Sequence, residues 1–111
     1  MKDNKLYLIH VNECIDRIEE YTRGGKDKFC SDHMAQDAVL RNLHTLTESI
    51  QRLSDDIKSK YPEVDWRAIS GFRNVVVHDY LGIDIDQIWD IVSRDLPELK
   101  TRVEAILEET A

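Results

Sequence analysis

The most restrictive feature of the sequence is a long apolar repeat in its middle. Apolar residues recur there at alternating intervals of four and three, at Val39, Leu43, Leu46, Ile50, Leu53 and Ile57. These intervals bring each residue back to one face of an α-helix, whereas a strand would need an interval of two. Ser31 or Asp32 can cap such a helix, and Pro62 ends it near Lys60 because proline cannot continue the hydrogen-bond ladder. The sequence therefore predicts a long central helix.

A shorter repeat predicts a helix before the central one. Its apolar face is formed by Tyr7, Val11, Cys14, Ile18 and Tyr21. Asp3 or Asn4 is available as its N-cap. The stretch RGGKDK at 23–28, with two glycines and four charges, then interrupts the pattern and predicts a turn.

Two further helices are predicted after Pro62. Asp65 can cap WRAISGFRNVVVHDY at 66–80, which we interpret as helix because the chain has no second strand-like run to pair with its three valines. After Gly82, a helix stop, Asp84 or Asp86 can cap the last helix, which Pro97 kinks or restarts. The expected fold is all-α: an up-and-down bundle of four to five helices in a single domain over 1–111.

Composition limits where the protein acts. The 111 residues are 41% hydrophobic and 33% charged, and no apolar run approaches the roughly 20 residues that cross a bilayer. The first ten residues, MKDNKLYLIH, are too polar for a secretory signal. We expect a cytoplasmic protein with no membrane contact.

The net charge of −7 is unevenly distributed. Positions 1–78 carry 13 acidic and 12 basic residues, and positions 79–111 carry 9 acidic and 3 basic residues. A nucleic-acid partner needs Lys and Arg against its phosphates, so an acidic total argues against one. Because the acidity belongs to the C-terminal segment, a positive cleft around Arg73 remains compatible with the sequence.

Metal binding has little support in the sequence. Cys14 and Cys30 have no CxxC spacing, so neither a disulfide framework nor a zinc site is indicated. His10 and Cys14 are four residues apart, as two ligands on one helix face would be. However, Cys14 falls on the apolar stripe and no further ligand lies nearby, so no metal site and no cofactor is predicted.

The segment RNVVVHDY at 73–80 gathers the chemically versatile side chains. Arginine matches phosphate oxygens with two parallel N–H groups, and histidine exchanges a proton near neutral pH. Asn74, one turn before His78, can orient its imidazole. Such a set suits metal-free cleavage of RNA. Arg73 and His78 are five residues apart, about 140° around a helix, so joining them needs the long arginine, a kink or a second chain.

A polar row lies along the predicted central helix. Asp37, Arg41, His44 and Glu48 follow one another at helical spacing. One interpretation is a solvated face with an ion pair between Asp37 and Arg41. The other is that the row lines the cleft into which RNVVVHDY faces.

RNVVVHDY resembles the R-x4-H-x-Y motif of the HepT-like toxins, a branch of the HEPN superfamily. AVLRNLHTL at 38–46, PEVDWRAISGFRN at 62–74 and LGIDIDQIWDIV at 81–92 are also similar to that family. The resemblance implies an all-α homodimer in which two copies of the motif meet across a cleft. It further implies catalytic roles for Arg73 and His78, with Asn74 and Asp79 supporting them.

The same resemblance implies a toxin of a type VII toxin-antitoxin system. Such a protein is a metal-independent endoribonuclease, and its antitoxin is a minimal nucleotidyltransferase, MntA-like, that attaches AMP to the motif tyrosine, here Tyr80. The alternatives are a noncatalytic helical subunit that binds a nucleotide or a partner enzyme, and a plain helical interaction protein. The full set of Arg73, His78 and Tyr80 favours the enzyme, because an adaptor has no chemical need for all three.

Overall fold

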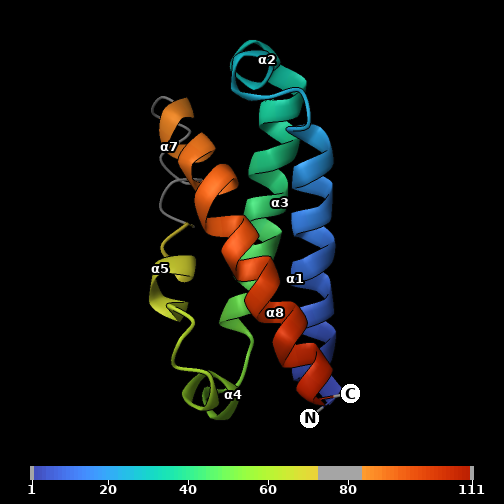
Figure 1. Cartoon of the computed structure of the whole chain (residues 1–111), viewed down its shortest axis with the longest axis vertical. Helices are drawn as coiled ribbons and strands as arrows, with labels where there is room; N and C mark the ends of the chain where they lie inside the picture. The colour runs from blue at the N-terminus through green and yellow to red at the C-terminus, as the bar shows by residue number, and fades with distance from the viewer. Residues whose placement is uncertain (1, 73–83, 111) are drawn as a thin grey trace.

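The computed structural model describes residues 2–72 and 84–110, and within them every regular element is helical. The long helix α1 (Lys2–Tyr21) runs antiparallel to α3 (His33–Gln51), and the short α2 (Lys26–Ser31) joins them at one end (Figure 1). Then come α4 (Asp55–Lys60) and α5 (Trp66–Ser70). After residue 83, α7 (Ile85–Asp90), a π-helical turn η2 (Ile91–Asp95) and α8 (Leu96–Thr110) follow one another without a break. The predicted all-α class is confirmed.

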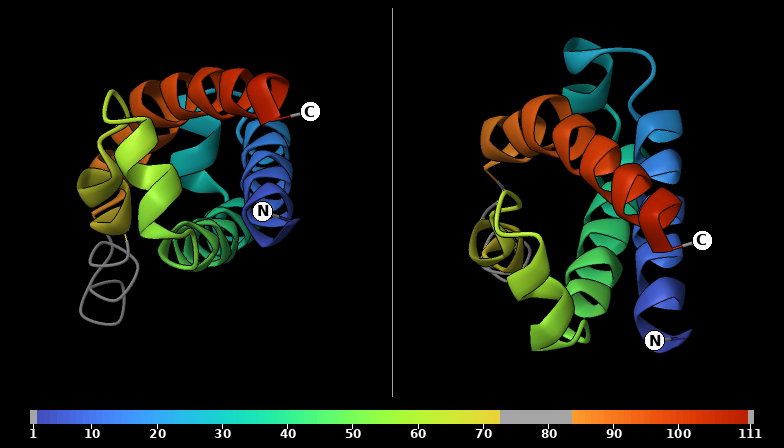
Figure 2. Two further views of the ribbon diagram at one scale, coloured as in Figure 1. Left: turned by 90° about the horizontal axis from the view of Figure 1, so that it is seen from below. Right: turned by 60° about the horizontal axis from the view of Figure 1, so that its bottom comes forward.

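The core lies where α1, α3 and α8 face one another. Seen along the bundle, these three helices surround the centre, and α4 and α5 close the remaining side (Figure 2). The side chains at the centre are almost completely buried and come from all three helices: Leu8, Val11, Ile15, Ile18, Val39, Leu43, Leu46, Ile50, Leu96, Val103 and Ile106. Burial of this apolar surface is the main force that holds the bundle together. None of the helices in the described ranges is long and apolar enough to cross a lipid bilayer.

The central helix breaks where the sequence predicted continuity. α3 ends at Gln51 and α4 begins at Asp55, although Leu53 and Ile57 are buried as predicted. The break coincides with a contact to α1. Asn4 donates from Nδ2 to Ser54 Oγ at 2.9 Å, and its Oδ1 accepts from the Ser54 N–H at 3.0 Å. Ser54 also accepts from the Ile57 N–H, at 3.4 Å, as the N-cap of α4. The prediction of one unbroken helix was wrong. The partner of Ser54 at the break is Asn4, fifty residues earlier, and the local apolar spacing contains no sign of it.

Two local predictions also need correction. α1 begins at Lys2, so Asp3 and Asn4 lie inside the helix and neither is its N-cap. The turn predicted over RGGKDK ends at Gly25, whose φ of +94° is a conformation that glycine adopts readily, and α2 begins at Lys26. The caps predicted at Asp32, Asp65 and Asp84 are confirmed.

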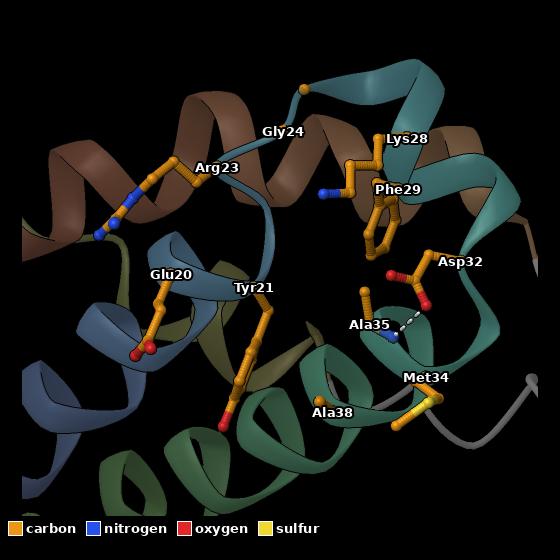
Figure 3. A pocket seen from close by; sticks show the side chains of 11 residues that line it. Glu20, Tyr21, Arg23, Gly24, Lys28, Phe29, Asp32, Met34, Ala35 and Ala38 are labelled. Carbon is orange, nitrogen blue, oxygen red and sulfur yellow. Dashed lines mark hydrogen bonds between the residues drawn. The ribbon is translucent and has the colours of Figure 1, made fainter.

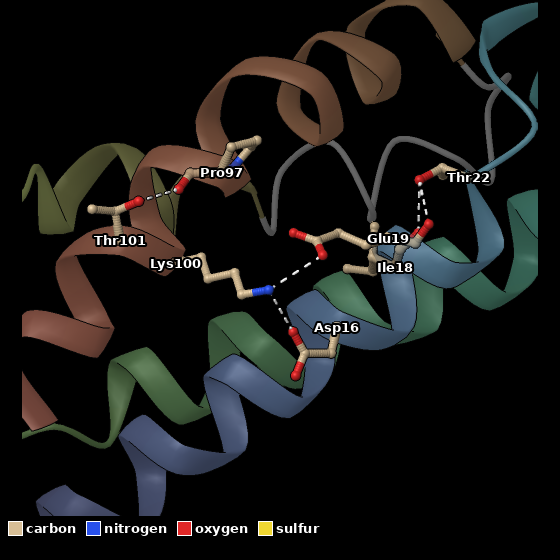
Figure 4. A network of polar contacts seen from close by, with 7 residues as sticks. All are labelled: Asp16, Ile18, Glu19, Thr22, Pro97, Lys100 and Thr101. Atoms are coloured by element: carbon tan, nitrogen blue, oxygen red, sulfur yellow. Dashed lines mark hydrogen bonds and ion pairs between the residues drawn. The ribbon is translucent and has the colours of Figure 1, made fainter.

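Pro97 changes the last helix without ending it. The N–H of Leu96 bonds to the carbonyl of Ile91, five residues earlier, in a π-helical turn that directly precedes the proline. Proline has no N–H, and its ring crowds the carbonyl four residues before it, so a widened turn is a common accommodation. Lys100 then connects α8 to α1 through Asp16 Oδ1 at 2.9 Å and Glu19 Oε2 at 3.3 Å (Figure 4). The hydrogen bond to Asp16 raises the pKa of Lys100.

Replacing Ser54 by alanine should lower the free energy of unfolding by about 1–2 kcal/mol, because it removes both the N-cap of α4 and the hydroxyl bonded to Asn4. Urea denaturation measures the difference. Ser59→Ala, an exposed position in the same helix, is the control. Equal stability of the two variants would contradict the importance of this contact.

Candidate functional site

Residues 73–83, which contain the predicted site residues, lie outside the described residues. Arg73, Asn74, His78, Asp79 and Tyr80 are therefore site predictions from the sequence. We refer to residues 73–83 as the motif segment. The structure does describe the chain on either side of it, with α5 before it and α7 after it.

The approach to the motif segment is anchored in the core. Asp65 caps α5: its carboxylate accepts a hydrogen bond from the Ala68 N–H at 3.0 Å. The indole N–H of Trp66 donates to the carbonyls of Lys58 and Tyr61, both at 3.1 Å. Phe72, the residue directly before Arg73, is only 7% exposed. The chain thus enters the motif segment from a fixed position.

The exit from the motif segment is attached to α2. Asp84 caps α7 by accepting from the Gln87 N–H at 3.1 Å. Lys26 Nζ on α2 lies 3.1 Å from Asp86 Oδ1, and this hydrogen bond raises the pKa of Lys26. The rings of Phe29 and Trp89 pack with their centroids 5.6 Å apart. The chain after the motif segment is therefore held by contacts with residues distant in sequence, whereas the chain before it is held by nearby residues of α4 and α5.

The polar row on α3 is mostly solvent-exposed. Asp37, Arg41 and Glu48 are exposed and His44 is half-buried. Between Asp37 and Arg41, both of them described residues, there is no ion pair. The pair within the row is His44 Nε2 with Glu48 Oε1 at 3.0 Å. Whether the row lines a cleft with the motif segment stays a prediction.

The side of α3 that faces α1 can be identified from one contact. Ser49 Oγ lies 3.2 Å from His10 Nδ1 on α1. His44 is five residues earlier, which places it about 140° around the helix from Ser49. The half-buried His44 of the polar row therefore faces away from α1.

His10 and Cys14, the two possible metal ligands of the first helix, are in surroundings that do not suit a metal ion. His10 contacts Ser49, and Cys14 is fully buried, so that burial raises the pKa of its thiol. Across residues 2–72 and 84–110, no three His, Cys, Asp or Glu side chains are grouped to hold a metal ion.

Residues of the described ranges line two separate cavities. The larger, about 350 Å³, lies between α1, α2 and α3. The smaller, about 120 Å³, lies between α5 and α8 and has four carboxylates around it: Glu63, Asp65, Asp95 and Glu98. Burial raises the pKa of Asp95. Neither cavity was predicted, because its lining comes from separate segments whose spacing in the sequence carries no common signal.

Comparison with known proteins identifies relatives over nearly the whole chain. A family model described as "Ribonuclease HepT-like" matches residues 11–106, a range that includes the motif segment. A Thermococcus cleftensis protein named "Probable ribonuclease HepT" is 34% identical over 106 residues, covering 95% of this chain and 96% of the relative. "Putative RNase MJ1380" of Methanocaldococcus jannaschii is 32% identical over 106 residues, covering 95% and 97%.

A third relative is about twice as long as this chain. The Methanocaldococcus jannaschii protein named "Gamma-glutamylcyclotransferase and putative RNase MJ0434" is 36% identical over 109 residues. That match covers 97% of this chain and 49% of the relative. No solved structure matches the chain significantly.

Proposed function

Because the chain belongs to the HepT-like ribonuclease family, we propose that it is a metal-independent endoribonuclease and the toxin of a two-component toxin-antitoxin system. The observation that carries this proposal is the family match over 11–106 together with the ordered Arg73, His78 and Tyr80 within it. The RNA is cleaved in the cytoplasm. A cognate nucleotidyltransferase neutralises the toxin by attaching AMP to Tyr80.

The proposed reaction is an internal phosphoryl transfer. The ribose 2′-oxygen loses its proton and attacks the adjacent phosphorus, and the bond to the 5′-oxygen of the next nucleotide breaks. The products are a 2′,3′-cyclic phosphate and a free 5′-hydroxyl. Arg73 binds the phosphate oxygens and stabilises the charge that develops on them. His78 transfers a proton, either from the 2′-hydroxyl or to the leaving 5′-oxygen.

A phosphate-binding group and a proton-transfer group fit a site made by two chains. In a two-fold dimer the Arg73 of one motif can bind the RNA phosphate while the His78 of the other motif transfers the proton, so the dimer has two such sites. Asn74 orients the imidazole, and Asp79 supports it from the next position after His78. The pairing also removes the difficulty that Arg73 and His78 are about 140° apart on one helix.

Cleavage should continue in excess EDTA and should leave 2′,3′-cyclic phosphate ends, because the proposed site uses an arginine and a histidine rather than a bound cation. The measurement is gel analysis of a labelled RNA, with mass spectrometry of the product ends. A 3′-hydroxyl product, or loss of cleavage in EDTA that Mg²⁺ restores, would contradict the mechanism. Nucleotide binding without any cleavage would favour the noncatalytic alternative.

The purified chain should have twice the 13.0 kDa mass of one protomer in solution, because the proposed site is complete only when two motif segments meet. Light scattering at micromolar concentration measures this mass. A strict monomer that still cleaves RNA would show that one chain holds a complete site.

A further inference from the structure

The larger cavity, between α1, α2 and α3, has a mixed polar and apolar lining. The turn after α1 forms one side, α2 forms the roof and the first turns of α3 form the floor (Figure 3). Its volume, about 350 Å³, lies within the range of small-molecule sites. The residues that matter for its chemistry are Tyr21, Lys28, Phe29, Asp32 and Met34.

The apolar part of this cavity is unusually exposed. Met34 is 83% exposed and Tyr21 is 40% exposed. Among the described residues, the other large hydrophobic side chains that are exposed are Leu6, at 62%, and Ile9, at 37%. Two of these four exposed side chains, Tyr21 and Met34, therefore border the same cavity. Phe29, only 1% exposed, closes the cavity from behind. A flat apolar ligand would cover surface that water now contacts.

Four charged residues line the cavity: Glu20, Arg23, Lys28 and Asp32. Lys28 extends its amine from α2 into the space beside the Gly24 turn (Figure 3), and within residues 2–72 and 84–110 it forms no ion pair. The carboxylate of Asp32 accepts from the Ala35 N–H at 3.1 Å as the cap of α3, so the helix N-terminus offsets its charge. The charged groups of Glu20 and Arg23 point away from the cavity. A ligand in the cavity would therefore meet a cation beside an aromatic ring.

We propose that this cavity is an accessory site for one nucleotide of single-stranded RNA. Its base packs on the ring of Tyr21 and the thioether of Met34, and a phosphate lies at Lys28. Aromatic stacking next to a cation is the general mode of single-strand recognition. Methionine adapts to flat ligands of different shape, so the site takes a base without selecting its identity. This inference rests on the proposed ribonuclease function, because it needs an RNA strand that also reaches the motif segment.

The contacts of α2 connect this cavity with the motif segment. Phe29 lines the cavity, and its ring packs on Trp89 of α7, the helix that directly follows residues 73–83. Lys26, two residues before Lys28, pairs with Asp86 of α7. α2 and α7 lie at the same end of the bundle (Figure 1). An RNA held at both places would bind more tightly than at either one, because the second contact becomes intramolecular.

Binding can be measured without cleavage. A fluorescently labelled RNA with 2′-O-methyl groups has no nucleophilic 2′-hydroxyl, so anisotropy reports affinity alone. Tyr21→Ala should raise the Kd about tenfold, within the range for loss of one stacked base. Lys28→Gln should lower the slope of log Kd against log salt by about 0.7, the value for one phosphate on a single strand. Leu6→Ala, an exposed apolar residue of α1, and Lys5→Gln, an exposed cation of α1, should do neither.

The outcomes separate the accessory site from the catalytic proposal. If the wild type cleaves RNA but Tyr21→Ala and Lys28→Gln bind like their controls, the accessory site is overturned and the ribonuclease stands. If binding depends on Tyr21 and Lys28 but no RNA is cleaved, the ribonuclease fails and the accessory site stands. Absence of RNA binding by the wild type overturns the site. If Tyr21→Ala or Lys28→Gln changes the oligomeric mass but leaves the RNA affinity unchanged, the site is also overturned. The cavity would then be a contact between protein chains.

Discussion

His78→Ala and Arg73→Ala should each reduce the rate of RNA cleavage by about 10²-fold or more. Loss of a group that transfers a proton typically costs about 10²–10⁴-fold, and loss of a group that stabilises developing charge about 10²–10³-fold. Arg73→Lys should recover only part of the rate, because an ammonium group cannot present two parallel N–H groups to a phosphate. A single-turnover assay with saturating protein measures the cleavage step itself.

Each variant has a matched control in the described part of the chain. Arg67 is an exposed arginine on α5, and His33 is an exposed histidine at the start of α3. Arg67→Ala and His33→Ala should retain cleavage close to that of the wild type. Far-ultraviolet circular dichroism and thermal unfolding establish that the inactive variants are folded. Wild-type rates in His78→Ala or Arg73→Ala would remove these residues from the mechanism.

Mixing the two inactive variants tests whether the site is shared between chains. A mixed dimer joins the Arg73 of one chain with the His78 of the other, which restores one of its two sites. If subunits exchange at random, half of the dimers are mixed, so activity should return to about a quarter of the wild-type value. No recovery after complete exchange would place Arg73 and His78 of one chain in the same site.

Incubation with the cognate nucleotidyltransferase and ATP should add AMP to Tyr80 and abolish cleavage. The added group carries a negatively charged phosphodiester, which can pair with Arg73 in place of the RNA phosphate, while the adenosine blocks entry. Each transfer breaks the α–β phosphate bond of ATP, joins the phosphorus to the tyrosine oxygen and releases pyrophosphate. The fraction of cleavage activity that is lost should equal the fraction of Tyr80 that is modified.

Mass spectrometry of the peptide that contains Tyr80 measures the modification. Tyr80→Phe removes the acceptor hydroxyl, so this variant should gain no AMP and should resist neutralisation. Tyr21→Phe is the control, since Tyr21 is 40% exposed and tests whether any accessible tyrosine is modified. A Tyr80→Phe protein that is still neutralised through AMP transfer would locate the acceptor elsewhere.

Helix faces and three of the helix starts followed from the sequence because they depend on neighbours within one or two turns. All six apolar residues of the central repeat, from Val39 to Ile57, are buried. Asp32, Asp65 and Asp84 each accept a hydrogen bond from an N–H three residues later. Tyr21 is the exception, since it ends the apolar stripe of α1 yet remains 40% exposed. Tyr21 is the last residue of α1, and the neighbouring helices do not cover this end of its apolar face.

The candidate catalytic residues could also be named from the sequence, because the arginine, histidine and tyrosine of RNVVVHDY match the family motif that this segment resembles. The supporting surroundings could not. The attachment of α7 to α2 depends on Lys26 with Asp86 and Phe29 with Trp89, pairs separated by sixty positions. Nothing in the spacing of either segment identifies the other as its partner.

The sequence by itself therefore determined the helical class, most of the buried faces, the caps at Asp32, Asp65 and Asp84, and the candidate reactive groups of the motif segment. All of these depend on side chains close together along the chain. Only the tertiary structure decided that the central helix divides at Ser54, that α2 holds α7, and that Tyr21, Lys28 and Met34 border one cavity. Each of these features depends on groups that are distant in sequence and meet only when the bundle packs.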